Sequence, residues 1–232
     1  LDFNFLKRLT DEYDSIRDII SDKSKFIEGT GIQYSSNPLY DATHLIGHPF
    51  IDSYSVNSFF IDFSKISLFE KLKVHRRRDE RLFKAPMLLI REGIELHNLT
   101  AKCAISTQDV LFKDSITSIK SLSNNNIDTI YNIAAILSSS LFAYYAINTF
   151  VSIGIERERV KNYNKYSLPY IDLNVKDKIK SIEKAYQEIY LEKKEVLQDN
   201  QKIDALNKKI QTELNNINET IYSRLKLNEI ET

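Results

Sequence analysis

The sequence predicts an α+β fold, in which an antiparallel or mixed β-sheet packs against helices and is followed by a helical, coiled-coil-like arm. Apolar, β-prone runs separated by turn residues lie between residues 86 and 119. A long helical pattern follows from Ile127 to Ile147, and helical periodicity fills the chain beyond Ile171. Strands grouped first and helices grouped afterwards are typical of the α+β class.

Composition limits the possible classes of protein. The chain has 232 residues and is 42% hydrophobic, which suits one large domain or one domain with an appendage. Its formal charge is zero, so it is not a generally basic nucleic-acid protein, and any basic site must be local.

The single cysteine, Cys103, excludes a disulfide framework and a cysteine-rich zinc site, which fits a reducing, cytoplasmic setting. No apolar run reaches the length of a membrane span, since the nearest, Ile127–Ile155, is broken by Asn132 and Asn148. There is no signal peptide pattern, and the chain starts at Leu1. We expect it to be a piece of a longer protein.

The first part of the chain alternates between regular and irregular patterns. Helical spacing predicts one amphipathic helix from Phe5 to Ser21. Phe26–Tyr40 reads as a strand that runs into a loop, and Asp41–Ser53 is irregular. Tyr54–Phe63 is typical of a strand, whereas Lys71–Lys84 lacks apolar periodicity and is expected to be an exposed loop or a short helix.

The central apolar runs predict the strands of the sheet. These runs are Pro86–Arg91, Ala101–Thr107 and Asp109–Ile119, with turns expected at Gly93, Asn98 and Asp114.

Asn124-Asn125-Asn126 predicts a turn that supplies the N-cap of a helix packed on the sheet. Val151–Tyr170 reads as a polar loop or strand. From Val175 a heptad rhythm predicts two helices with a break at Asp199-Asn200. Acidic and basic side chains are nearly equal in number in these two helices, so we expect them to form a solvated helical arm. We place a domain boundary near Ile171, giving a domain of residues 1–170 and a helical arm of residues 171–232.

Positive charge is densest between residues 71 and 84. Guanidinium and ammonium groups spaced along such a loop suit a phosphate backbone, and arginine also suits guanine edges. The alternative is a solvated loop whose cations pair with nearby acids. A second, weaker patch interleaves with glutamates and includes Lys165. The candidate DNA-binding residues are Lys71, Lys73, Arg76, Arg77, Arg78, Arg81, Lys84, Arg157, Arg159 and Lys161.

Exposed aromatics add a further hypothesis, because Tyr34, Tyr40 and Tyr54 suit contact with sugars or bases. Packing in the core is the alternative for each of these rings.

The chain offers no predicted catalytic, cofactor or metal site. Asn37-Pro38-Leu39-Tyr40 resembles the Asn-Pro-Pro-Tyr motif of amino-methyltransferases, but it lacks the second proline, so a turn is the better interpretation. His44 and His48 have helical metal-ligand spacing, yet Gly47 and Pro49 favour a loop. No clustered carboxylates suggest a nuclease.

Several segments together resemble the TaqI-like C-terminal specificity domain, the target recognition domain of adenine-specific DNA methyltransferases in restriction–modification systems. Ser35 stands where the family's entry loop has its usual glycine. In chain order, the similar segments are Gly31-Ile32 with Asn37 and Tyr40, Lys84–Arg91, Phe112–Ile116, Ile136–Phe142, Leu168-Pro169 and Ile217–Leu225.

The resemblance implies a DNA recognition module, with double-stranded DNA and the parent's own catalytic domain as partners. The catalytic motifs and the S-adenosylmethionine site would precede Leu1, so no cofactor is expected in this chain, and whether the parent also cuts DNA stays open. A fragment of a type I restriction specificity subunit is an alternative, although only one copy of the domain is visible. A protein-interaction module that does not bind DNA is another.

Overall fold

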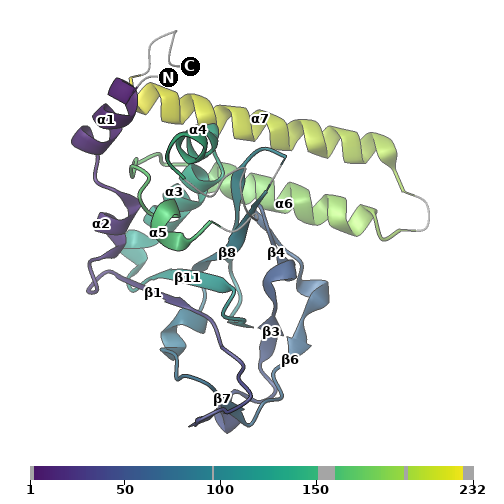
Figure 1. Ribbon diagram of the computed structural model, residues 1–232. Helices are drawn as coiled ribbons and strands as arrows, with labels where there is room; N and C mark the ends of the chain where they lie inside the picture. Colours follow the sequence, from purple (N-terminus) through teal and green to yellow (C-terminus); the bar gives the residue numbers. More distant parts are fainter. Residues whose placement is uncertain (1–2, 96, 151–159, 196–197, 227–232) are drawn as a thin grey trace.

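The computed structural model describes residues 3–95, 97–150, 160–195 and 198–226. Its centre is a four-stranded antiparallel sheet in the order β1-β11-β8-β9. These strands are β1 (Phe26–Thr30), β8 (Met87–Glu95), β9 (Thr100–Ser106) and β11 (Ile116–Ser121). The α+β class predicted from the sequence is confirmed (Figure 1).

Strand β8 is buried on both of its faces. Leu88 and Ile90 belong to one hydrophobic core, whereas Met87 and Leu89 belong to a second core on the opposite side. Successive side chains of a strand point to opposite faces, so an unbroken apolar run is what a doubly covered strand requires. We call these sides the helical side and the loop side.

Helices cover the helical side (Figure 1). The helix predicted from Ile127 to Ile147 is wrong as a single element, because the chain bends by 62° at Ser138-Ser139. Ser139 caps the second helix by accepting a hydrogen bond from the Phe142 amide, which favours a new helix start there. The helices of this side that follow the sheet in the chain are α3 (Ile127–Leu137), α4 (Ser140–Thr149), α5 (Asn162–Lys165), α6 (Lys176–Glu192) and α7 (Asn200–Arg224).

Within the described residues, no single helix is long and apolar enough to cross a membrane. Two helical segments that are bent relative to each other, Asn124–Leu137 and Ser140–Thr149, together have the length and composition of a membrane span. Residues Ile130 to Leu137 of this pair are buried in the core of the helical side.

The two predicted C-terminal helices are present, and the break at Asp199-Asn200 is confirmed. Asp199 caps α7 by accepting a hydrogen bond from the Lys202 amide at 3.0 Å. Ile203, Ile210 and Ile217 are buried at heptad spacing, in the same core as the sheet residues of the helical side. The boundary near Ile171 stays a prediction.

The predicted first helix, Phe5–Ser21, is instead two helices, α1 (Phe3–Glu12) and α2 (Ile16–Ile20). Ser15 and Asp18 form a capping box that begins α2 and ends the continuous helical path. The Ile16 amide also donates to the Leu168 carbonyl at 2.8 Å, so the break is fixed by a distant part of the chain.

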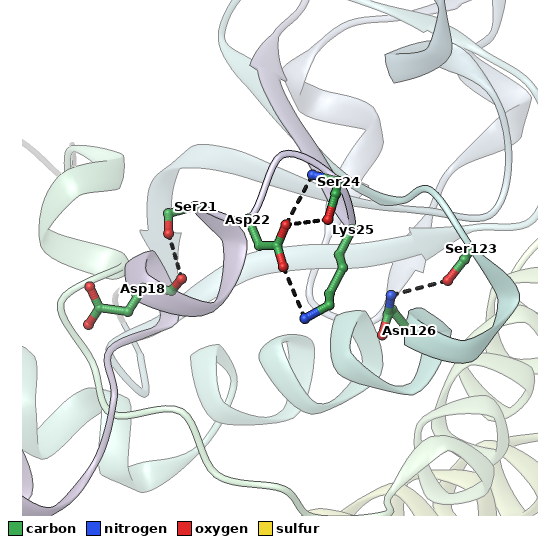
Figure 2. A network of polar contacts seen from close by, with 7 residues as sticks. All are labelled: Asp18, Ser21, Asp22, Ser24, Lys25, Ser123 and Asn126. Carbon is green, nitrogen blue, oxygen red and sulfur yellow. Dashed lines mark hydrogen bonds and ion pairs between the residues drawn. The ribbon is translucent and has the colours of Figure 1, made fainter.

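A polar network fixes the turn between α2 and β1 (Figure 2). The Asp22 carboxylate accepts hydrogen bonds from Ser24 and pairs with Lys25 at 3.0 Å, and its pKa is lowered to about 2 chiefly by the Ser24 hydroxyl. Beside it, Asn126 occupies the N-cap position of α3, but its amide donates to the Ser123 hydroxyl and makes no capping bond. The predicted turn is present, whereas the predicted side-chain cap is not.

The loop side is built from short strands. The predicted strand Tyr54–Phe63 is instead a small hairpin, in which Phe59 takes a positive φ of 58° at the turn and is buried in the core of the helical side. Strands β2 and β7 pair, β4 pairs β5, and β3 lies between β10 and β6. Their bounds are β2 (Tyr40–Asp41), β3 (Pro49–Ile51), β4 (Val56–Asn57), β5 (Phe60–Ile61), β6 (Ser67–Leu68), β7 (Lys73–Val74) and β10 (Leu111–Phe112).

Of the three turns predicted in the sheet region, those at Asn98 and Asp114 are confirmed. Gly93 is not a turn and lies inside β8, between Ile90 and Ile94, where the pairing with β9 shifts register. Glycine inside a strand commonly marks such an irregularity.

Candidate nucleic-acid interface

The basic loop is attached to the loop side through the segment that follows β1. Gly31 lies against the chain between β10 and β11 so closely that a Cβ would stand 2.1 Å from the Phe112 carbonyl oxygen. The Ile32 amide donates to that same carbonyl at 2.7 Å, and the Asp114 amide donates to the Ile32 carbonyl at 3.0 Å. Only glycine permits this approach. Residue 31 therefore fixes the position of the segment to which the basic loop is attached.

Residues 71–84 form β7 and a 3-10 turn, Glu80–Phe83, joined by irregular backbone. Val74, Leu82 and Phe83 are buried and hold the segment on the loop side, while most of its charged side chains are exposed. The prediction of an exposed loop is confirmed, with a two-residue strand added by pairing with β2.

Three of the predicted DNA-binding cations are engaged by the protein itself. Arg81 pairs with Asp79 at 2.7 Å, which raises the pKa of the arginine, and Lys84 pairs with Asp109 at 2.9 Å. Arg78 is partly buried, and its Nε donates to the Gly31 carbonyl at 2.8 Å. Arg78 and Lys84 attach the loop to other parts of the chain, whereas Arg81 pairs within the loop itself.

The remaining cations of the loop are exposed, and no acid among the described residues lies within ion-pair distance of them. Lys71 lies 5.9 Å from the centre of the Tyr34 ring, and Arg77 lies 5.7 Å from the centre of the Tyr40 ring. Both rings are about 40% exposed, as a surface residue that contacts a ligand must be. We call this set the rim cations: Lys71, Lys73, Arg76 and Arg77.

A depression of about 350 Å³ lies beside the rim cations. Arg76, Arg77 and Arg78 line it together with acidic side chains, Asp41 and Glu80. Apolar residues, Ile32, Val74 and Phe83 among them, complete the lining. Such a surface presents both hydrogen-bond donors and acceptors.

A neighbouring hollow of about 380 Å³ shares His44 and Glu80 with this depression. The His44 Nε2 lies 3.0 Å from a Glu80 oxygen, so this histidine pairs with a carboxylate on the basic loop. His48 also lines the second hollow. The described residues contain no group of three or more side chains that could hold a metal ion.

The second predicted patch is only partly described. Arg157 and Arg159 lie outside the described residues. Lys161 is exposed and lines a polar hollow of about 650 Å³ together with Lys113, which sequence reasoning missed. Lys113 occurs in the segment Phe112–Ile116 that carries the family resemblance. Its place in that segment was the sequence signal that could have identified it as a candidate.

Lys165 is not a surface residue, contrary to the sequence interpretation. It is fully buried, and its Nζ donates to the Arg91 and Glu92 carbonyls at 2.6 and 2.9 Å. Burial lowers its pKa to about 7. Because these carbonyls belong to the irregular part of β8, Lys165 satisfies backbone groups that the sheet leaves unpaired.

Tyr54, which the sequence suggested for contact with sugars or bases, lies beside a cation that was not among the candidates. Arg91 lies 5.1 Å from the centre of the Tyr54 ring, which is 68% exposed. Arg91 lies inside β8, where a lone arginine gave no sequence signal.

No family model matches this chain, and no curated protein matches it. Among solved structures, the chain is similar to part of MmeI, a type IIL restriction–modification enzyme whose structure was determined in complex with DNA. The two chains share 13% sequence identity at a TM-score of 0.48, over 88% of this chain and 33% of the enzyme. The chain thus spans about a third of the length of that enzyme.

Proposed function

We propose that this chain is a DNA target recognition domain of a restriction–modification enzyme and that it grips duplex DNA with the loop side. One observation carries the proposal: the four rim cations are exposed and lack acidic partners among the described residues, and two of them, Lys71 and Arg77, lie over exposed tyrosine rings. A phosphate backbone offers the closely spaced negative charge that these side chains lack within the protein.

The balanced charge of the whole chain supports this interpretation. With a formal net charge of zero, attraction to DNA must come from a local concentration of cations. The two acids of the basic loop have other partners, since Asp79 pairs with Arg81 and Glu80 lies 3.0 Å from the His44 Nε2, and neither lies within ion-pair distance of a rim cation. The rim therefore keeps its charge for an external partner.

The resemblance given above supports a more detailed proposal about the parent protein. Its catalytic domain would transfer a methyl group from S-adenosylmethionine to adenine N6 in the cytoplasm, and this chain would position the DNA. An enzyme that flips a base out of the stack must hold the flanking duplex while it does so. A specificity subunit of a type I enzyme would use the same surface.

The test is a titration of random duplex DNA with this chain across a salt series. The variant Lys71→Ala/Arg76→Ala/Arg77→Ala removes three rim cations and leaves Arg78, which has a structural contact. Its matched control, Lys184→Ala/Lys208→Ala/Lys209→Ala, removes the same charge from exposed positions of the helical arm. We expect the rim variant to lower the slope of log affinity against log salt by about three, or roughly one per lost phosphate contact.

The control should keep the slope of the unmodified chain. Equal slopes for the two triple variants would mean that attraction is not localised at the rim. Absence of binding by the unmodified chain at low salt would overturn the proposal and favour a protein-interaction module.

A further inference from the structure

Strands β2 and β7 form a two-stranded antiparallel ribbon at the end of the molecule away from the helical arm (Figure 1). Its hydrogen bonds extend beyond the strand bounds, since the Leu39 amide donates to the Val74 carbonyl at 3.1 Å and the Ala42 amide to the Leu72 carbonyl at 2.8 Å. Ala42 and Val74 are buried and anchor the ribbon to the loop-side core. The remaining side chains are free to contact a partner.

One face of this ribbon combines three different chemistries. Asp41 and Lys73 are directly opposite each other in the register and are both exposed. Leu39 lies two residues before Asp41, so strand alternation places it on the same face, where it is 64% exposed. We call Leu39, Asp41 and Lys73 the ribbon face.

Asp41 and Lys73 do not form an ion pair although the register places them opposite each other. Neither has an oppositely charged group within 4.0 Å among the described residues. One Asp41 oxygen accepts a hydrogen bond from the Thr43 hydroxyl at 2.8 Å, which orients the carboxylate and leaves its other oxygen available. The ribbon face thus presents an acceptor, a donor and an apolar group separately.

We infer that the ribbon face enters the major groove of duplex DNA and reads base edges. This inference rests on the proposed function and assigns the base-reading residues within it. A two-stranded ribbon fits the width of the major groove. There, Lys73 would donate to guanine O6 or N7, Asp41 would accept from the amino group of cytosine or adenine, and Leu39 would contact a thymine methyl group.

Asp41 makes the strongest case for base reading. An exposed carboxylate beside rim cations weakens attraction to phosphates, so a surface that only gripped the backbone would gain nothing from it. A carboxylate that meets a base amino group instead excludes the bases that present an acceptor at that position. The Asp41 carboxylate would then lower affinity for DNA in general and, by the same charge, make binding selective for bases that present an amino group.

The rim cations outside the ribbon face take the complementary role. Lys71 lies over the ring of Tyr34, and Arg77 lies over the ring of Tyr40 in β2. Arg77 also lines the depression next to Asp41. These side chains would bind phosphates and set the position of the ribbon. Phosphate binding and base recognition would then belong to different residues.

The experiment selects bound duplexes from a pool with a randomised central stretch, using the whole chain, and sequences them. We expect the unmodified chain to enrich guanine at one position and an amino-bearing base at another. Lys73→Ala should lose the guanine preference by about tenfold or more, while leaving the other position unchanged. Asp41→Asn should shift its position toward adenine, because an amide pairs with adenine N6 and N7.

Asp41→Ala gives the most discriminating result, since two effects of opposite sign are expected. Affinity for the random pool should rise because a negative charge is lost, while preference at one position should disappear. The matched control is Glu70→Ala, which removes an exposed negative charge just before the ribbon. It should raise affinity for the pool without changing any base preference.

The groove is tested with duplexes methylated by dimethyl sulfate, which marks guanine N7 in the major groove and adenine N3 in the minor groove. Interference at guanine N7 that vanishes in Lys73→Ala supports the inference. Interference only at adenine N3 would overturn it.

Base preferences that persist in both ribbon variants, or binding without any preference, would also overturn the inference while leaving the proposed function intact. Failure of the chain to bind DNA at low salt would overturn both. Melting curves by circular dichroism verify that each variant is folded, as expected for exposed positions.

Discussion

The two sides of the central sheet are built in opposite ways. The helical side is covered by long elements such as α6 and α7, and buried isoleucines recur through its core. The loop side is covered by strands of two or three residues joined by 3-10 turns. Aspartate side chains cap three of those turns, at Asp52, Asp62 and Asp79. Long elements bury surface by themselves, whereas short elements depend on side-chain hydrogen bonds and on the shared sheet.

Charge follows the same division. On the helical side, Lys176 pairs with Asp128 at 2.8 Å, and buried Lys165 is satisfied by backbone carbonyls. On the loop side, the rim cations have no acidic partner among the described residues. Under the proposed function, the helical side chiefly stabilises the chain and the loop side carries its interaction surface.

The largest expected effect tests whether the two sides unfold together. Leu88 and Leu89 are adjacent and fully buried, but they face the helical side and the loop side respectively. Substitution of either by alanine leaves a cavity and should lower the free energy of unfolding by about 2–5 kcal/mol. Urea denaturation followed by circular dichroism should show one transition for each variant. A Leu89→Ala variant with an unchanged midpoint would mean that the loop side unfolds independently.

The next effect concerns the attachment of the basic loop. Gly31→Ala places a Cβ 2.1 Å from the Phe112 carbonyl oxygen, so the backbone must move, at a cost of about 3 kcal/mol. We expect weaker DNA binding as well, because Arg78 is attached to the Gly31 carbonyl. Gly47→Ala is the matched control: it has open space but a φ of +80°, and should cost only about 1 kcal/mol. Thermal melting and DNA titration of both variants measure the difference.

A pH effect tests the buried lysine of the helical side. Burial lowers the pKa of Lys165 to about 7 in the folded chain, below the ordinary lysine value of 10.5. Above pH 7 the unfolded chain therefore binds one more proton than the folded chain, so this group makes the free energy of unfolding rise with pH. Between pH 7 and 9 the gain is up to about 2–3 kcal/mol. Lys165→Met should remove that rise in urea titrations, and an equal rise in both proteins would assign it to other groups.

The smallest effect compares matched ion pairs on the two sides. Asp79→Asn keeps an N-cap for the 3-10 turn but frees Arg81 from its ion pair. One more free cation at the rim should make DNA binding tighter at low salt and steepen its salt slope by about one. Glu192→Gln frees Lys202 in the same way on the helical arm and should leave DNA binding unchanged. If both variants steepened the slope equally, the loop side would have no special role.

The sequence by itself determined the elements whose signal is local. The apolar runs of β8 and β9, the turns at Asn98 and Asp114, and the break before α7 at Asp199 follow from residue type and spacing. The exposed basic loop was also visible, because charge without apolar periodicity indicates a solvated segment. These features depend on neighbouring residues alone.

Tertiary structure decided which of the predicted cations are available. Lys165 and Lys161 look alike in the sequence, yet one is buried under β8 and the other is exposed. Arg78 directly follows Arg76 and Arg77, which have no acidic partner among the described residues, but is attached to Gly31, which lies far from it in the chain. The helix break at Ser15 is likewise fixed from elsewhere in the fold, because the Ile16 amide donates to the Leu168 carbonyl.

The pairing of β2 with β7 shows the same limit most clearly. It sets Asp41 opposite Lys73 across a long intervening segment that no local pattern predicts. Secondary-structure propensity and charge density are patterns of a few neighbouring residues, so the sequence alone was enough to identify the basic loop. The ribbon face exists only because a core of distant apolar residues, including Ala42 and Val74, holds its two strands together.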